Sequence, residues 1–178
     1  AQDVSIFDDG PFTGEISANM LFNESIKFCL VGHSERRQHF NETNETVKKK
    51  STKLIESKII PIICVGETLE EKENKLTERV LSKQLEEGLS EVANDKNSII
   101  AYEPVWAIGS GLTPSLEEIE SVHVFIRKLN SKFNNFRILY GGSIKSTNST
   151  NIKNLKNVDG CLVGGSSLKV EEFNTIIS

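Results

Sequence analysis

Hydrophobic positions along this chain fall into two alternating patterns. Short, nearly continuous apolar runs predict β-strands that are buried on both faces, at residues 27–31, 59–65, 98–102, 136–140 and 160–163. A further strand-like segment, residues 1–5, opens the chain. Between these runs, apolar residues recur every three or four positions, which predicts helices over residues 43–57, 77–93 and 115–133.

The start of the third helix carries two sets of capping signals. Thr113 is a candidate N-cap with Pro114 at the first helical position, and Ser115 with Glu118 has the spacing of a capping box. Both signals place a helix directly after a glycine-containing loop.

Strands that alternate with helices predict an α/β fold with a parallel sheet or a barrel, here as a single domain over residues 1–178. Nearly every predicted strand ends in polar or glycine-rich residues, as expected where a (β/α)₈ barrel collects its chemistry. A Rossmann domain would instead carry a G-x-G-x-x-G turn after its first strand, and that pattern is missing. The strand ends therefore favour the barrel.

Composition narrows the function classes. The net charge of -4 argues against a nucleic-acid partner, and no apolar run is long enough to span a membrane. The short basic run at residues 48–50 is interpreted as the solvated face of a helix. The three cysteines lie in hydrophobic runs and are expected to be reduced and buried, which fits the cytoplasm, with a plastid-like organelle as the alternative. The spacing of cysteines and histidines predicts no metal site.

The segment from Ala101 to Pro114 is the strongest candidate for chemistry. Glu103 ends an apolar run, and a hydrophobic stem then leads to a tip with Gly109, Ser110 and Gly111. A carboxylate beside a glycine-tipped loop suits a catalytic base next to a hinged lid. An ordinary strand-loop-helix junction with an exposed glutamate is the alternative.

His33 is the natural partner for Glu103. It follows an apolar run, and Ser34 is expected to cap the helix after it, whose N-terminal dipole disfavours the imidazolium. In a barrel both side chains lie at the same mouth, where a carboxylate base and a neutral imidazole suit proton abstraction beside a carbonyl. A structural histidine bonded to the backbone is the alternative for His33 taken alone.

Two glycine pairs end the last two predicted strands, in Gly141-Gly142-Ser143 and Gly164-Gly165-Ser166. Their backbone N–H groups suit a phosphate site of the kind found late in such barrels. Arg36 is expected to pair with Glu15 as structural support, although Arg36 and Arg37 are alternatives for direct phosphate binding.

Together these residues resemble the triosephosphate isomerase family, with motifs in the same order along essentially the whole chain. The motifs are Phe12-Thr13-Gly14-Glu15-Ile16-Ser17, Gly32-His33-Ser34-Glu35-Arg36-Arg37, Cys64-Val65-Gly66-Glu67, Ala101-Tyr102-Glu103-Pro104-Val105-Trp106-Ala107-Ile108-Gly109, Tyr140-Gly141-Gly142-Ser143 and Leu162-Val163-Gly164-Gly165-Ser166-Ser167-Leu168. The resemblance implies an aldose-ketose isomerase that interconverts dihydroxyacetone phosphate and D-glyceraldehyde 3-phosphate in glycolysis and gluconeogenesis, without a metal or organic cofactor.

By the same resemblance, Glu103 is the base and His33 the electrophile, while Pro104 to Thr113 forms the lid. Phosphate contacts are implied for Gly109, Ser110, Ser143, Gly164 and Gly165, and supporting roles for Ser34, Glu35, Arg36 and Glu15. Residues 8–17 resemble a dimer loop in which Thr13 reaches toward the partner's site, so a homodimer is expected.

The chain departs from the family pattern at its start. The family's first two βα units, which carry a substrate-binding asparagine and lysine, have no counterpart here. We therefore expect about six of the eight βα units, and very low activity of this chain alone. The main alternative is a catalytically impaired relic that serves as a phosphate-binding or assembly module. Another phosphosugar barrel enzyme is a third possibility.

Overall fold

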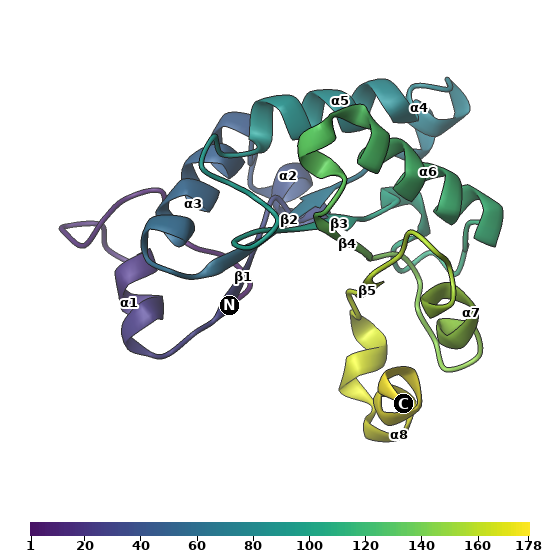
Figure 1. Cartoon of the computed structure of the whole chain (residues 1–178). Coiled ribbons are helices and arrows are strands. Elements are labelled where there is room, and N and C mark those ends of the chain that lie inside the picture. Colours follow the sequence, from purple (N-terminus) through teal and green to yellow (C-terminus); the bar gives the residue numbers. More distant parts are fainter.

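A computed structural model describes residues 1–178 and contains a five-stranded parallel sheet (Figure 1). The strands follow their sequence order across the sheet, so each pairs with the strands that precede and follow it along the chain. Their bounds are β1 (Phe28–Val31), β2 (Ile60–Val65), β3 (Ile99–Tyr102), β4 (Arg137–Tyr140) and β5 (Gly160–Cys161). All five lie within the predicted runs, and all five end at the same edge because they are parallel.

Helices connect the strands in the manner of repeated βα units. They are α1 (Ala18–Asn23), α2 (Ser34–His39), α3 (Asn44–Glu56), α4 (Leu69–Glu73), α5 (Thr77–Gly88), α6 (Leu116–Leu129), α7 (Ser149–Lys153) and α8 (Val170–Ile177), with short 3₁₀ turns at Val105–Ala107, Ser131–Phe133 and Gly165–Leu168. In Figure 1, α3, α5 and α6 stand side by side over one face of the sheet. No helix combines the length and the apolar content that crossing a bilayer demands.

The hydrophobic core lies between the sheet and this row of helices. Isoleucines at matching positions of the three central strands are fully buried, and so are the leucines and isoleucines that face them from α3, α5 and α6; the set comprises Ile63, Ile100, Ile138, Leu54, Leu81, Leu85, Ile119 and Ile126. All four residues of β3 are buried, as predicted for a central strand. Phe28, at the start of the first strand of the sheet, is 45% exposed.

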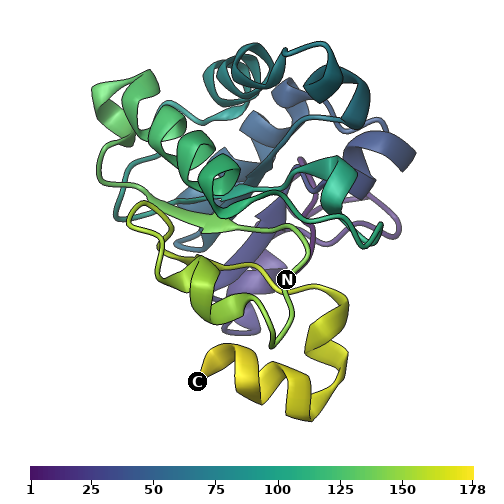
Figure 2. The same cartoon turned by 90° about the vertical axis from the view of Figure 1, so that its right-hand side faces the viewer.

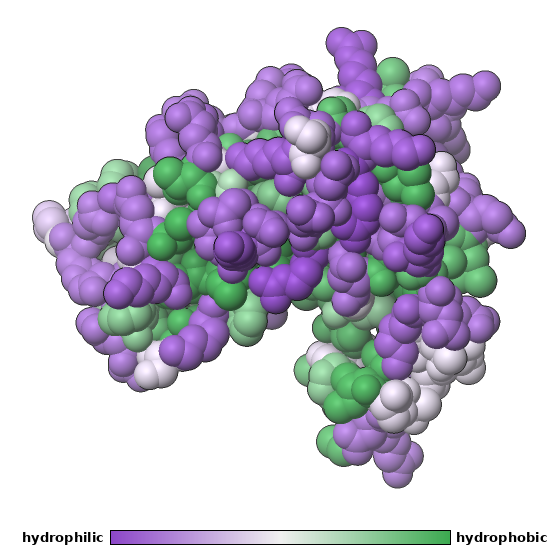
Figure 3. All heavy atoms as spheres, in the orientation of Figure 1, coloured by the Kyte–Doolittle hydropathy of each residue, from purple (hydrophilic) through white to green (hydrophobic).

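The sheet is curved but not closed. Figure 1 shows α8 and the end of the chain standing apart from α1 across a wide opening, and Figure 2 shows the same chain end below the rest of the molecule. The space-filling view shows a hollow there with hydrophobic surface along its walls (Figure 3). Large apolar side chains are exposed on both of the flanking segments, among them Met20, Phe22, Leu168, Val170 and Ile177. Exposed apolar surface of this kind favours association with another surface.

Three helix boundaries differ from the prediction. The predicted helix 77–93 ends at Gly88, because Leu89 has an extended backbone at ψ 131° and the apolar residues beyond it belong to a turn. The predicted helix 115–133 ends at Leu129, where Asn130 is extended at φ -152°. Thr113 is not an N-cap: Ser115 is, and it forms the full capping box with Glu118.

Two predictions near the N-terminus and in α3 are also corrected. Residues 1–5 form no strand, although Ala1 exchanges two hydrogen bonds with β1, because Ser5 already turns away to bond Ile16. The basic run at residues 48–50 is not uniformly solvated. Lys50 is buried at 6% exposure and its Nζ lies 2.9 Å from Glu42 Oε2 and 2.6 Å from Asp3 Oδ1.

We expect Lys50→Met to lower the free energy of unfolding by about 3 kcal/mol, because it leaves the buried Glu42 carboxylate with one cation fewer. Lys49→Met is the matched control: Lys49 is exposed and pairs only within its own helix, so a change below about 0.5 kcal/mol is expected. Urea denaturation measures both. Equal effects of the two substitutions would contradict a special role for the buried pair.

Candidate active site

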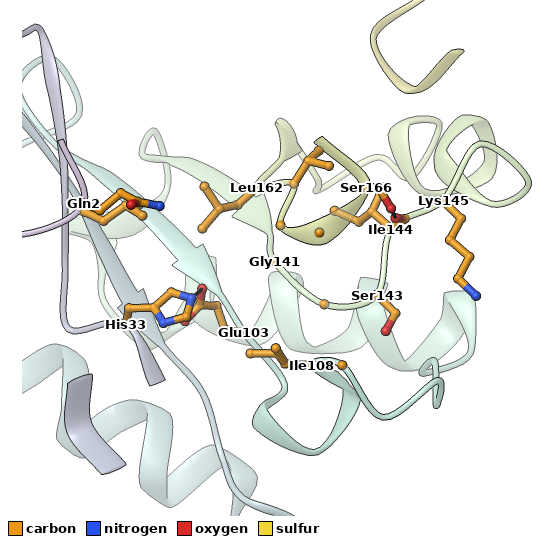
Figure 4. A pocket seen from close by; sticks show the side chains of 16 residues that line it. Gln2, His33, Glu103, Ile108, Gly141, Ser143, Ile144, Lys145, Leu162 and Ser166 are labelled. Carbon is orange, nitrogen blue, oxygen red and sulfur yellow. Dashed lines mark hydrogen bonds and ion pairs between the residues drawn. The ribbon is translucent and has the colours of Figure 1, made fainter. Parts of the chain in front are cut away.

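The Glu103 side chain is held at the end of β3 in a nearly dry position. Its backbone N–H donates to Val65 O at 2.8 Å, which continues the pairing with β2 by one residue, and the residue is 2% exposed. Glu103 Oε1 lies 3.3 Å from His33 Nε2, and Glu103 Oε2 accepts from Ser34 N at 3.3 Å. Figure 4 shows the carboxylate and the imidazole facing each other across the ends of β1 and β3. The predicted juxtaposition of these two residues is confirmed.

His33 is placed by a tightly held loop after β1. Gly32 adopts a φ of +72°, its N–H donates to Glu42 Oε1 at 2.8 Å, and its carbonyl accepts from Arg37 Nε at 2.8 Å. The Arg37 guanidinium also donates to Cys64 O at the end of β2. The buried charges behind the loop therefore fix the backbone from which His33 projects.

The cap of α2 differs from the prediction. The side chain of His33 itself is the N-cap, with Nδ1 accepting from Glu35 N at 3.3 Å, while Ser34 is the first helical residue. A ring nitrogen that accepts a hydrogen bond carries no proton, so the neutral imidazole carries its proton on Nε2. That proton is on the atom that faces Glu103 and the cavity.

Burial raises the pKa of Glu103 above the usual glutamate value, because it penalises the charged form. The proximity of His33, the Ser34 N–H and a hydrogen bond from the Cys64 thiol oppose this effect. A raised pKa brings a carboxylate closer to the range in which it works well as a general base. The structure contains no cluster of three or more His, Cys, Asp or Glu side chains arranged around a metal.

Two glycines make room for the Glu103 residue. A Cβ on Gly66 would lie 1.7 Å from Glu103 O, and a Cβ on Gly141 would lie 2.9 Å from Glu103 Cγ. Any side chain at either position displaces the carboxylate or its backbone. Gly141 and Gly142 belong to the pair that the sequence assigned to phosphate binding. Packing within the protein also requires glycine at both positions, since a Cβ on Gly142 would meet the Tyr140 hydroxyl.

A cavity of about 300 Å³ opens beside Glu103 and His33. Its far wall consists of the loops after β4 and β5, and Ile108 and Gly109 of the predicted lid border it (Figure 4). Ser143, Gly164 and Gly165 all line the cavity, as predicted. Nothing lies within 4 Å of a Cβ built on Gly164 or Gly165, so these two glycines leave their side of the cavity open to a ligand.

The predicted lid, Pro104 to Thr113, contains a 3₁₀ turn at Val105–Ala107 near its start and is followed closely by Ser115, the N-cap of α6. Its stem is anchored by Glu67, whose Oε1 accepts from Trp106 Nε1 at 2.8 Å and from the Tyr102 hydroxyl at 3.1 Å. Ser143 Oγ donates to Ala107 O, so the stem also touches the cavity wall. Gly109 and Gly111 have positive φ angles, as a sharply turned tip requires.

Several predicted site residues lie elsewhere. Ser110 is exposed at the lid tip, outside the cavity lining, and bonds Trp106 O. Glu35 points largely into solvent with 69% of its side chain exposed. Arg36 does play a structural role, but it pairs with Asp3 and Glu42, not with Glu15, which is exposed. Thr13 is exposed on the loop 8–17, which has no part in the cavity.

Sequence reasoning missed four contributors to this region. Gln2 and Lys145 line the cavity, Glu67 anchors the lid stem, and the Cys64 thiol lowers the pKa of Glu103. Glu67 and Cys64 belong to motifs noted above, and Glu67 closely follows β2 as Glu103 follows β3, whereas Cys64 lies within β2. Gln2 and Lys145 carry no such signal, because only the three-dimensional arrangement brings residues 2 and 145 to the same cavity, at its opposite ends (Figure 4).

Comparison with known proteins agrees with this geometry. The family model described as triosephosphate isomerase matches residues 1–178. The chain is 50% identical to the triosephosphate isomerase of Alkaliphilus oremlandii over 187 residues, which cover 100% of this chain and 75% of that protein. It is 45% identical to the triosephosphate isomerase of Francisella philomiragia over 184 residues, covering 99% of this chain and 73% of that protein.

The chain belongs to the triosephosphate isomerase family. The crystal structure of the triosephosphate isomerase from Bartonella henselae superimposes with a TM-score of 0.91 at 38% identity, covering 99% of this chain and 74% of that one. The five-stranded sheet therefore has the fold of an incomplete (β/α)₈ barrel, as the strand ends predicted. Within the family, the chain spans about three quarters of the length of these relatives.

The raised pKa of Glu103 predicts the pH dependence of any reaction in which Glu103 is the base. Because the base must be ionised, kcat/KM should fall as the pH drops through the pKa of Glu103, at a pH above the usual 4.5. Cys64→Ala removes a donor that stabilises the carboxylate, so the fall should move to higher pH, whereas Cys64→Ser keeps a donor and should not move it. A pH profile that is identical for all three proteins would contradict this assignment.

Proposed function

We propose that this chain interconverts dihydroxyacetone phosphate and D-glyceraldehyde 3-phosphate through an enediolate intermediate, with Glu103 as base and His33 as electrophile. The observation that carries the proposal is the 3.3 Å approach of His33 Nε2 to the buried Glu103 carboxylate at the mouth of a cavity of about 300 Å³. Membership of the triosephosphate isomerase family supports the same reaction and its phosphorylated triose substrate.

In the first step the Glu103 carboxylate takes the proton from the carbon next to the substrate carbonyl. The electron pair of that C–H bond forms the C=C bond of the enediolate, and the carbonyl oxygen takes up the negative charge. The His33 Nε2–H donates a hydrogen bond to this oxygen, which stabilises the charge as it develops. The imidazole then gives its Nε2 proton to this oxygen and takes the proton of the neighbouring hydroxyl in exchange, which leaves His33 unchanged. Protonated Glu103 returns its proton to the neighbouring carbon, so every proton is accounted for without a cofactor.

The opposite wall of the cavity suits the phosphate group. Gly164 and Gly165 leave open space beside their backbone, and Ser143 lies on the same wall. Unhindered backbone N–H groups are good phosphate ligands. Gly109 is the lid residue proposed to complete this cradle, since it borders the cavity and has the positive φ of a turn that approaches a ligand closely.

A homodimer is proposed as the assembled form. Residues 8–16 of the loop are exposed, and the rings of Phe12 and the neighbouring Phe7 stack at 4.2 Å although both are partly open to solvent. Aromatic rings exposed at the surface are typical of interfaces.

Thr13→Arg is expected to convert such a dimer to monomers, because a bulky charge at the loop tip opposes burial. Sedimentation velocity measures the outcome, and Thr150→Arg, at an exposed position of α7, should leave the assembly unchanged. A wild-type protein that sediments as a monomer at all concentrations would contradict the dimer.

The role of Glu103 is tested by Glu103→Asp in a coupled assay with D-glyceraldehyde 3-phosphate. The shorter side chain draws the carboxylate back by about 1 Å, so kcat should fall on the order of 100-fold relative to the parent protein. Glu86→Asp, at an exposed position of α5, is the control and should not change kcat. Equal rates for Glu103→Asp and the parent protein would remove Glu103 from the role of base.

A further inference from the structure

One side chain outside the cavity contacts both ends of the lid. The ammonium group of Lys72, on α4, lies 3.5 Å from the centroid of the Trp106 ring. The same Nζ lies 3.0 Å from Glu118 Oε1 on α6. Trp106 belongs to the turn with which the lid begins, and Glu118 belongs to the capping box with which it ends, so Lys72 bridges segments that lie far apart along the chain.

The Glu118 carboxylate contacts both Lys72 and the backbone just after the C-terminal end of the lid. While Oε1 faces Lys72, Oε2 accepts from the backbone N–H of Ser115 at 2.7 Å, and Glu118 N donates back to Ser115 Oγ at 3.1 Å. At the other end, the indole N–H donates to Glu67 and the ring face meets the Lys72 ammonium. Both ends of the lid are therefore fastened to one another through a single cation.

In this arrangement the lid borders the cavity only through Ile108 and Gly109, and its tip lies open to solvent. Residues 109–113 are all exposed, and nothing lies within 4 Å of a Cβ built on Gly109 or Gly111. Beneath the two lid ends is a separate cavity of about 380 Å³, lined by Lys72, Glu67, Trp106, Pro114 and Glu118 among others. To swing over the active site, a lid must change its backbone angles at its ends, which are the segments that Lys72 holds.

We propose that Lys72 is a positioning residue of the lid, which stabilises the open arrangement by holding Trp106 and Glu118 together. The proposal rests on the proposed function in that closure over a bound phosphate ester is the movement it opposes. Lys72 contacts neither the cavity nor its lining residues Glu103 and His33. Lys72 therefore acts through the lid, and it shifts the equilibrium between the open and closed forms of the lid.

The geometry distinguishes Lys72 from an ordinary surface lysine. Its side chain is only 32% exposed, and the cation–π contact and the ion pair share one ammonium group. A cation–π contact at a partly exposed site favours one arrangement over another by about 2- to 5-fold. Lys83 on α5 is exposed and forms no ion pair, which makes it a suitable control.

Trp106 is the single tryptophan of the chain, so intrinsic fluorescence reports on the lid stem alone. We expect Lys72→Met to change the Trp106 emission of the unliganded protein and to lower the inorganic phosphate concentration that half-saturates it by about 2- to 5-fold. Lys72→Arg keeps a cation that stacks on an indole and pairs with a carboxylate, so it should restore the parent behaviour. Lys83→Met should match the parent protein throughout.

A double-mutant cycle with Glu118→Gln gives a second measurement that does not depend on one variant. If Lys72 acts through Glu118, the combined substitution should shift phosphate binding by less than the product of the two single shifts. Multiplicative effects, or a Lys72→Met protein whose emission and phosphate titration match those of the parent, would overturn the proposal. A general loss of packing would not be rescued by Lys72→Arg, and circular dichroism checks that each variant folds.

The outcome is separable from the fate of the proposed isomerase function. If the parent protein neither isomerises D-glyceraldehyde 3-phosphate nor binds phosphate, the proposed function fails. The Trp106 emission of unliganded Lys72→Met and Lys72→Arg then still decides whether Lys72 holds the lid stem. If the parent protein isomerises and the emission and titration of Lys72→Met are unchanged, only the role of Lys72 fails.

Discussion

The buried carboxylate of Glu103 imposes the constraint around which this end of the sheet is built. Withdrawing a carboxylate from water is costly unless donors face it, and at 2% exposure Glu103 depends on the His33 ring and the Ser34 N–H, while the Cys64 thiol also lowers its pKa. These partners come from the ends of β1 and β2, neighbouring strands in register beside β3. Parallel pairing therefore both buries the base and supplies the groups that keep it paired.

A second layer of charge fixes the position of His33. Glu42 accepts from Gly32 N and pairs with Arg36 and Lys50, while Arg37 donates to Gly32 O and to the end of β2. None of these four charged side chains lines the active-site cavity. Their contribution is geometric: because a hydrogen-bonded loop has little freedom, the imidazole is held within reach of Glu103 before any ligand arrives.

The sequence was sufficient for the strands, the family and the pairing of His33 with Glu103, because apolar runs and polar strand ends are local signals. It was insufficient wherever a residue's role depends on a partner far along the chain. The sequence indicates a surface lysine at position 50, whereas the structure pairs Lys50 with Asp3 and Glu42. The sequence also suggested Glu15 as the partner of Arg36, which pairs with Asp3 instead. The Gly141-Gly142 pair does line the cavity, but the sequence could not show that Glu103 and Tyr140 fill the space that side chains would occupy there.

Glu67 shows how the base and the lid are mechanically joined. It lies one residue beyond Gly66, which must be glycine because the Glu103 backbone passes there, and its carboxylate accepts from Tyr102 directly before Glu103 and from Trp106 three residues after it. Burial raises the pKa of Glu67, and its second oxygen has no partner, so this carboxylate is held at a cost. An apolar residue would pack there without that cost, but it would leave the indole N–H unpaired and the lid stem without an anchor. Glu67 is consequently a polar anchor for both β3 and the lid stem. A movement of Trp106 acts first on Glu67, which also contacts Tyr102 in the strand that carries the base.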